Sequence, residues 1–372
     1  MYQKGERKMS RIEPPKIRKN LEDSKVKITM LADGFVDEVW EIVEARTGPE
    51  DYTLYEKMNQ FANRILKAGS GGLGLELIKK RRTFGGFAAN IGYAAANLGV
   101  DTTLMGVFGK DTIDPSFVEV GELCTLVSLD EPAVTQVFEF GDGKLLMTNL
   151  GPILTIDWKV IEETVGLEKI KSLLEQSDII GVGYWSLMPY FDEIVEKVCE
   201  HLPEDGKKRR LFFDLADLHK KSVDSLKTSL ALIKALGKKT PMTLSLNEHE
   251  AAAIFGLYGE TLDDVGQPLP EKLEKVRKCL GIDELVVHDP HYGAAASEGE
   301  EPAYVKASFC THVVRSAGAG DNFNGGYIAA KLAGLDIVER LHVANATVGH
   351  FIRVGEFPSV EQMVARLNIT EE

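Results

Sequence analysis

An acid stands directly behind three small residues near the end of the chain, in the segment RSAGAGDNFNGGYIAA. Gly318, Ala319 and Gly320 precede Asp321, and the apolar residues that follow recur at the spacing of a helix with one buried face. Backbone N–H groups in the first turn of a helix have no partner within the helix, and the helix dipole favours an anion there. The sequence therefore predicts a phosphate-binding site with the carboxylate of Asp321 beside it.

The same pattern has a simpler interpretation, in which Asp321 only caps the helix and the glycines only form a tight turn. Two further glycines, Gly325 and Gly326, stand inside the predicted helix. Each destabilises a helix interior by about 1 kcal/mol relative to alanine. We therefore expect another backbone or a ligand to approach the helix closely at these two positions.

A second glycine motif, GGFAANIGYAAANLG, covers residues 85–99. Its apolar residues predict a helix that is entered through Gly85 and Gly86 and ends at Gly99. Asn90 falls in the first turn, where its amide is able to donate to and accept from hydroxyl groups. The alternative is that Asn90 merely caps the helix.

A third motif, GSGGLG at residues 69–74, matches the glycine spacing of a dinucleotide-binding loop. That loop requires a strand before it and a helix after it. Here a predicted helix precedes the motif, so we interpret Gly69 as the C-cap of that helix, followed by a flexible link.

The elements that must position these residues alternate along the chain. Six short apolar runs predict strands and two of the intervening segments predict helices: strands at 26–32, 102–108, 178–184, 210–216, 242–246 and 284–288, and helices at 188–202 and 223–237. This alternation is typical of an α/β fold, with a mostly parallel central sheet and helices on both faces. Ligands bind beyond the carboxyl ends of the strands in such a sheet.

Two segments break the alternation. Residues 135–149 predict an antiparallel hairpin, and residues 36–45 have part of a strand's alternation. We expect these lid segments to form a small β lid over the edge of the sheet, with an inserted helix at 51–68 near it. Because such a lid exposes sheet edges, we also predict a homodimer formed through two lids.

Composition excludes several classes of protein. The 372 residues include 57 acidic and 43 basic side chains, a net charge of −14 without a basic block, which argues against nucleic acid as a partner. The four cysteines have no CxxC spacing, and no run of 18 apolar residues exists, so we expect a cytoplasmic protein that does not interact with membranes. Residues 1–26 are charged and are predicted to be a mobile tail, with the folded domain over 27–372.

Several motifs together resemble the PfkB/ribokinase family of carbohydrate kinases. Gly85, Gly86 and Asn90 match that family's GGxxxN segment, and residues 317–327 match its GAGD segment. Three further stretches follow the family pattern in order: GVFGKD (106–111), SLNEHEAAAIFG (245–256) and VANATVGHFIRVGEFPS (343–359). The resemblance spans residues 27–368 and implies a ribokinase-like fold.

The resemblance implies a role for each matching residue. Asp321 is expected to be the general base, and the N–H groups of Gly318, Ala319 and Gly320 are expected to form the anion hole. Glu250, with Asn247, is expected to organise Mg²⁺, partly through water. Gly293 and Asn345 are expected to lie near the adenine. Asp37, at the end of the first strand, is expected to bind sugar hydroxyls together with Gly85, Gly86 and Asn90. A capping pair at a helix start is the alternative for Asn247 and Glu250.

Two of the departures from the family pattern lie near the expected cation and nucleotide sites. Arg315-Ser316-Ala317 stands where the family usually has Asp-Thr-Thr, which places potassium activation in doubt. His288-Asp289-Pro290 replaces a TLG-like run that faces the nucleotide, so the choice between ATP and ADP as donor stays open. His288 and His291 also have the types of a metal pair, although no cluster of further ligands accompanies them.

Together these features predict a kinase that transfers the γ-phosphate of ATP, with Mg²⁺, to a hydroxymethyl group of a sugar or sugar-like molecule. A nucleoside kinase of the same fold is the nearest alternative. A protein of another class, a non-catalytic sugar sensor on a kinase scaffold, is favoured by Arg315 and the altered segment at His288 but opposed by the intact Asp321.

Overall fold

A nine-stranded sheet forms the centre of the molecule. The computed structural model of the chain describes residues 12–262 and 269–367. The strand order is β14-β13-β12-β11-β10-β9-β1-β5-β6, parallel except where β13 and β14 join antiparallel. Its strands are β1 (Lys27–Leu31), β5 (Asp101–Gly106), β6 (Cys124–Ser128), β9 (Ile179–Val182), β10 (Arg210–Asp214), β11 (Met242–Asn247), β12 (Glu284–Asp289), β13 (Tyr292–Ser297) and β14 (Ala303–Lys306). All six predicted strands are confirmed, as is the mostly parallel sheet.

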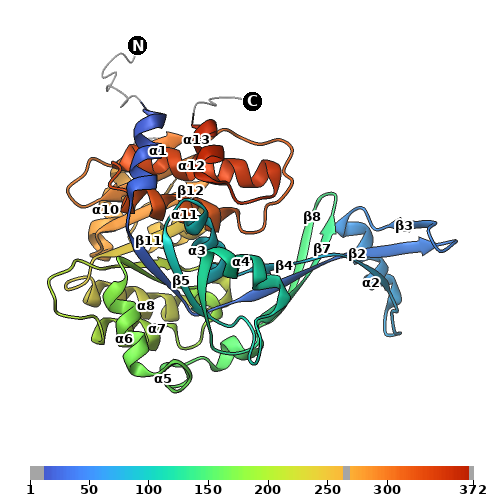
Figure 1. Ribbon diagram of the computed structural model, residues 1–372. Coiled ribbons are helices and arrows are strands. Elements are labelled where there is room, and N and C mark those ends of the chain that lie inside the picture. The colour runs from blue at the N-terminus through green and yellow to red at the C-terminus, as the bar shows by residue number, and fades with distance from the viewer. Residues whose placement is uncertain (1–11, 263–268, 368–372) are drawn as a thin grey trace, which may run out of the picture.

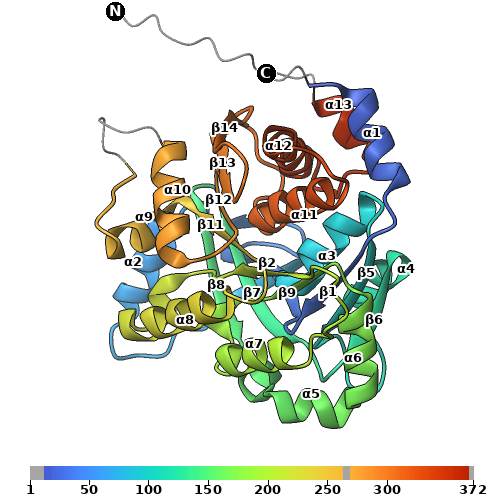
Figure 2. The ribbon, with the colours of Figure 1, turned by 90° about the vertical axis from the view of Figure 1, so that its left-hand side faces the viewer.

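Helices cover both faces of this sheet, as Figure 2 shows. One face carries α3 (Phe87–Asn97), α4 (Val118–Leu123), α11 (Ala319–Leu332) and α12 (Ile337–Val354). The other carries α5 (Trp158–Val165), α6 (Leu167–Gln176), α7 (Phe191–Glu200), α8 (Val223–Leu236), α9 (Glu248–Leu257) and α10 (Leu269–Leu280). The helices predicted at 188–202 and 223–237 correspond to α7 and α8 and are confirmed.

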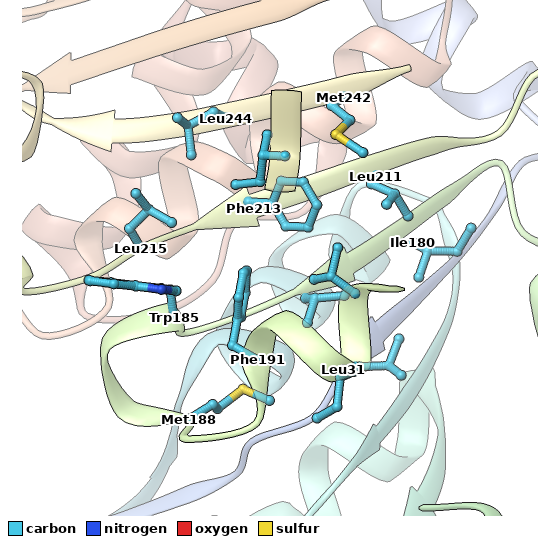
Figure 3. Packing of buried hydrophobic residues seen from close by; sticks show 14 of the residues in the cluster. Leu31, Ile180, Trp185, Met188, Phe191, Leu211, Phe213, Leu215, Met242 and Leu244 are labelled. Atoms are coloured by element: carbon cyan, nitrogen blue, oxygen red, sulfur yellow. The ribbon is translucent and has the colours of Figure 1, made fainter. Parts of the chain in front are cut away.

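Alternation along the strands divides the apolar side chains between two cores. Leu211 and Phe213 of β10 point to the face covered by α7, where Phe191 packs against Phe213 (Figure 3). Phe212 points to the opposite face, toward Phe87 of α3. Because both faces are buried, the strands read as nearly continuous apolar runs.

A smaller sheet extends sideways from this body (Figure 1). Its long central strand β2 (Phe35–Arg46) pairs with β4 (Glu76–Gly85) on one side and with β7 (Ala133–Phe140) and β3 (Tyr52–Leu54) on the other, and β8 (Gly143–Asn149) completes the hairpin with β7. Both lid segments are thus confirmed as strands of a smaller sheet.

The insertion at 51–68 was only partly predicted. The helix, α2, begins at Met58 rather than at residue 51, and the residues before it include β3. Phe61 of α2 stacks on Phe140, and the backbone N–H of Met58 donates to the Asp142 carboxylate, so the insertion supports the tip of the β7–β8 hairpin. Gly69 is the C-cap of α2, with φ 57°, as predicted.

The prediction of a mobile tail over residues 1–26 is wrong for its second half, while residues 1–11 lie outside the described part. Residues Pro14–Asp23 form helix α1, which packs against α13 (Val360–Arg366). Ile17 and Leu21, one helical turn apart, are fully buried. The number of charged residues hid this short apolar stripe, and two prolines at the start favour the helix.

The two glycines inside α11 are explained by packing. A methyl group added at Gly325 would lie 2.5 Å from Cβ of Ala94 in α3, and one added at Gly326 would lie 2.5 Å from Oγ1 of Thr347 in α12. The expected close approach is therefore confirmed, and helices α3 and α12 make it.

The described parts of the chain include no helix that is long and apolar enough to cross a membrane. The four cysteines carry free thiols.

Candidate active site

Asp321 is the third residue of α11 and is held by two side chains from other elements. The Tyr184 hydroxyl donates to its Oδ1 at 2.6 Å, and Asn90 Nδ2 donates to its Oδ2 at 2.8 Å. The N-cap residue is Gly318, with φ 84°, and no side chain caps it. The interpretation of Asp321 as a simple helix cap is therefore wrong, since its oxygens contact side chains across the site.

Asn90 connects the two glycine motifs. Its helix α3 has Gly86 as the N-cap residue, with φ 97°, so the alternative of Asn90 as a helix cap is also wrong. A methyl group on Gly318 would lie 3.1 Å from Asn90 Nδ2, which explains the glycine there. Asn90 Oδ1 is buried and has no hydrogen-bond partner in the described structure, so it is free to accept from a ligand hydroxyl.

The first turn of α11 presents backbone donors. Ala319 donates its N–H to the Ser316 carbonyl at 3.2 Å, while no acceptor within the described ranges faces the N–H of Gly318 or Gly320. These residues are partly exposed, whereas Asp321 is buried. The turn therefore offers two unengaged N–H groups beside the carboxylate, an arrangement suited to an anion.

Asp33 is a site residue that the sequence analysis missed. Its two carboxylate oxygens accept from the N–H groups of Phe87 and Ala88, each at 2.9 Å, and so cap α3. A methyl group on Gly86 would lie 3.0 Å from Asp33 Oδ2, so a glycine is needed here. The available signal was an acid two residues after β1, at the carboxyl end of the sheet.

Asp33 belongs to a cluster of four buried acids. Burial is the largest cause of a raised pKa in all four: the pKa is about 7 for Asp33, 6 for Asp214, 9 for Glu250 and 8 for Asp321. Repulsion from the Asp214 carboxylate raises the pKa of Asp33, Glu250 and Asp321 further. Across residues 12–262 and 269–367, none of the four has an ion-pair partner within 4 Å. Asp214 ends β10 and accepts from Asn324 at 2.9 Å; it too was missed.

Asn247 and Glu250 form a capping box at the start of α9. The Glu250 carboxylate accepts from the Asn247 backbone N–H at 3.0 Å, and Asn247 Oδ1 accepts from the Glu250 N–H at 3.0 Å. The alternative, in which Asn247 and Glu250 cap the start of a helix, is therefore confirmed. Among the described residues no group of three or more His, Cys, Asp or Glu side chains is arranged to hold a metal ion, so the magnesium role stays a prediction.

Asp37 lies in β2 and not at the end of the first strand, which corrects its expected position. It is opposite Thr135 of β7, and a methyl group on Gly85 would lie 3.0 Å from its Oδ2. Burial raises the pKa of Asp37 to about 6, opposed by the positive charges of Arg315 and then Lys144.

Two cations act on Asp37, Lys144 from the smaller sheet and Arg315 from the body. Lys144 of β8 donates to Ser316 Oγ at 3.1 Å, next to the GAGD turn. The Arg315 guanidinium lies over the rings of Phe351 and Phe357, at 4.9 and 5.7 Å from their centroids. Neither cation was predicted to face Asp37, because the contacts join segments far apart in sequence.

The residues expected near adenine also come together. A methyl group on Gly293 would lie 2.9 Å from Phe323 and 3.3 Å from Asn345 Oδ1. Asn345 donates to the Val305 carbonyl at 3.4 Å. Gly293, Asn345 and Phe323 therefore contact one another beside β12.

Comparison with known proteins now adds to this geometry. The family model described as prokaryotic ketohexokinase matches residues 8–369. A ketohexokinase from Haloferax volcanii is 29% identical over 337 residues, which cover 90% of this chain and 88% of that protein.

Solved structures agree on the fold. Ribokinase of Arabidopsis thaliana, complexed with ribose and ATP, has a TM-score of 0.66 and 17% identity over 93% of this chain and all of its own. A ribokinase II of E. coli, in complex with ATP and Mg²⁺, has a TM-score of 0.62 and 15% identity over 92% of this chain and 99% of its own.

The chain belongs to the prokaryotic ketohexokinase family. The expectations of a ribokinase-like fold and of a sugar kinase are thereby confirmed.

Proposed function

We propose that this member of the prokaryotic ketohexokinase family transfers the γ-phosphate of ATP to a hydroxymethyl group of a ketohexose. The observation that carries the proposal is the buried Asp321 carboxylate, held by Asn90 and Tyr184 beside the unengaged N–H groups of the α11 turn. The named activity of the H. volcanii relative supports a ketohexose as the acceptor.

In the proposed reaction, Asp321 accepts the proton of the attacking sugar hydroxyl as the new O–P bond forms. The bond between the γ-phosphorus and the bridging oxygen breaks, and ADP leaves with that electron pair. The N–H groups of Gly318 and Gly320 would neutralise charge on the transferring phosphoryl group, and the N–H of Ala319 would join them once it leaves the Ser316 carbonyl. Such charge stabilisation is the main contribution to rate acceleration in phosphoryl transfer.

A divalent cation is proposed to lie at two acids of the cluster, Glu250 and Asp214. Buried carboxylates with raised pKa values and no cationic partner require positive charge before all of them ionise. Glu250, partly through water, and Asp214 would hold Mg²⁺, and Asn247 would orient Glu250. When bound, Mg²⁺ would neutralise phosphate charge and position the phosphate chain.

The remaining assignments follow the placement of each residue. Asp37, with Gly85, Gly86 and Asn90, is proposed to bind the sugar, because Asn90 Oδ1 has no hydrogen-bond partner in the described structure and Asp37 packs against Gly85. Gly293 and Asn345 are proposed to contact adenine, since the Phe323 ring and the Asn345 amide both pack against Gly293 beside the start of α11.

The smaller sheet is proposed to act as a lid over the sugar and to pair in a homodimer. Lys144 already connects β8 to the GAGD turn, and β8 leaves one edge unpaired in the described sheet. Its side chains Leu146 and Met147 are about half exposed, which suits a contact with a second copy. Sedimentation that shows a monomer at every concentration would contradict the dimer. We also propose a cytoplasmic location, which the free thiols support.

A substrate panel tests the proposed function. Fructose and other ketohexoses, aldoses, ribose and nucleosides would each be incubated with ATP or ADP in the presence of Mg²⁺. We expect ATP consumption and a phosphorylated product with a ketohexose. A preference for nucleosides would support the nucleoside kinase instead, and sugar binding without phosphoryl transfer would support the sensor.

A further inference from the structure

His288 lies between the residues proposed to contact the nucleotide. It is the fifth residue of β12, beside Asn247 of β11 in the parallel register and opposite Gly293 of β13. The proposed magnesium-side residue and the proposed adenine-side residue are thus its two neighbours in the sheet.

The imidazole ring reaches the first turn of α11. A methyl group added at Gly320 would lie 2.9 Å from His288 Cε1 and 3.4 Å from Nε2. On its other side the ring contacts Phe323, with ring centroids 5.0 Å apart. Gly320 therefore leaves the space that the ring occupies, and Nε2 is the ring nitrogen nearer the phosphate-binding turn.

The ring lacks the partner that a mostly buried histidine normally has. Neither ring nitrogen makes a hydrogen bond to any described residue, and no carboxylate pairs with it. Burial lowers the pKa of His288 to about 4, so the ring is neutral near pH 7 and carries one N–H donor and one acceptor. The ring nitrogens are not fully buried, so the unpaired donor is open to a ligand that lies against the Gly320 turn.

We propose that His288 is a nucleotide-binding residue, whose Nε2–H donates to an oxygen of the phosphate chain lying against Gly320. This inference rests on the proposed ATP site and names a contact that the family motifs did not supply, since His288 replaces the TLG-like run. A neutral donor forms a hydrogen bond to the phosphate but no ion pair, so ADP release has no additional ion pair to break.

Two variants separate hydrogen bonding from packing. His288→Gln keeps an N–H donor, whereas His288→Leu keeps an apolar side chain in contact with Phe323 but has no donor. Binding of MgADP and MgATP would be measured by calorimetry. Because a hydrogen bond to a charged group is strong, we expect about a tenfold or greater loss of affinity in His288→Leu and a smaller loss in His288→Gln. The melting temperature of the nucleotide-free protein should stay close to that of the wild type in both.

His201→Ala is the matched control, because His201 follows the end of α7 and its ring stacks on Trp158 instead of a site residue. We expect its nucleotide affinity to equal that of the wild type. Wild-type affinity in His288→Leu would overturn the proposal, as would equal losses in both variants accompanied by a lower melting temperature. If the wild type bound no nucleotide, the proposed function itself would fail.

Discussion

Replacing Asp321 by asparagine tests the proposed base with little change of shape. The Tyr184 hydroxyl is still able to donate to the amide oxygen. The amide NH₂ would face Asn90 Nδ2, but Asn90 Oδ1 has no partner in the described structure, so rotating the Asn90 amide restores a hydrogen bond. The rotated Asn90 then presents its NH₂ group to the sugar, whose hydroxyl is able to accept as well as donate, so we expect the variant to fold and to bind sugar and nucleotide.

Turnover should nevertheless fall by about 10² to 10⁴, which is the usual contribution of general-base catalysis. This corresponds to about 3 to 5 kcal/mol of lost transition-state stabilisation, at 1.36 kcal/mol per decade. Phosphoryl transfer from ATP to the best ketohexose would be measured with the sugar saturating, so that the loss appears in kcat. Asp336→Asn is the matched control, because Asp336 caps α12 through the N–H groups of Val338 and Glu339 and takes no part in the site. Its turnover should be unchanged.

Stability gives a second measurement on the same Asp321 variant. The pKa of Asp321 is raised from 3.8 to about 8 in the folded protein, so folding favours the protonated carboxyl. Stabilisation from this group is complete below pH 4 and is lost as the pH rises through 8, at about 1.4 kcal/mol per pKa unit. Asparagine does not titrate. We therefore expect the free energy of unfolding of the variant, relative to that of the wild type, to be at least about 1 kcal/mol higher at pH 9 than at pH 5. Turnover near that of the wild type would refute the base, and a collapsed melting temperature at both pH values would mean that Asp321 is structural.

Three other predictions concern neighbouring groups. Tyr184→Phe removes the hydrogen bond that lowers the pKa of Asp321, so the rising limb of the kcat/KM–pH profile should shift to higher pH; an unshifted profile would contradict the role of Tyr184. Exchange of potassium for a bulky organic cation at constant ionic strength should change activity little, because Arg315 stands where the family usually has an aspartate that helps to hold the ion; a several-fold drop would show that the ion site survives. Residues 36–45 and 135–149 should exchange amide hydrogens faster than the central strands and gain protection with a sugar that is turned over; equal protection would contradict lid closure.

Local sequence patterns were sufficient for the central sheet and for the turn before Asp321. Buried parallel strands read as short apolar runs, and a glycine-rich helix start has a recognisable composition. The strand β4 was missed because it reads ELIKKRRTFG, a run of basic residues. It is a strand because β2 pairs with it along nearly its whole length, which is a tertiary effect that overrides local pattern.

The hydrogen bonds between site residues were harder to predict from the sequence than the identity of those residues. Asn90 and Asp321 are far apart in the chain, and nothing local indicates that one amide donates to the other carboxylate. Asp33 and Asp214 follow or end strands of the sheet, which was a usable signal, but an acid after a strand is as often a turn residue. Tyr184 was not separable from the apolar run that precedes it.

The acidic cluster connects folding with binding. Burial raises the pKa of its four carboxyls, and the described chain supplies no cation beside them to oppose this, so folding favours their protonated forms; the stability that results is lost as the pH rises. A cation bound between Glu250 and Asp214 would favour the ionised forms instead, which is the state that Asp321 needs as a base. Mg²⁺ binding should therefore stabilise the protein more at pH 8 than at pH 6, because fewer protons must leave at the higher pH. The same acids that destabilise the cation-free protein at high pH would thus make its affinity for Mg²⁺ depend on pH, and they would couple ionisation of the base to the arrival of the phosphate donor.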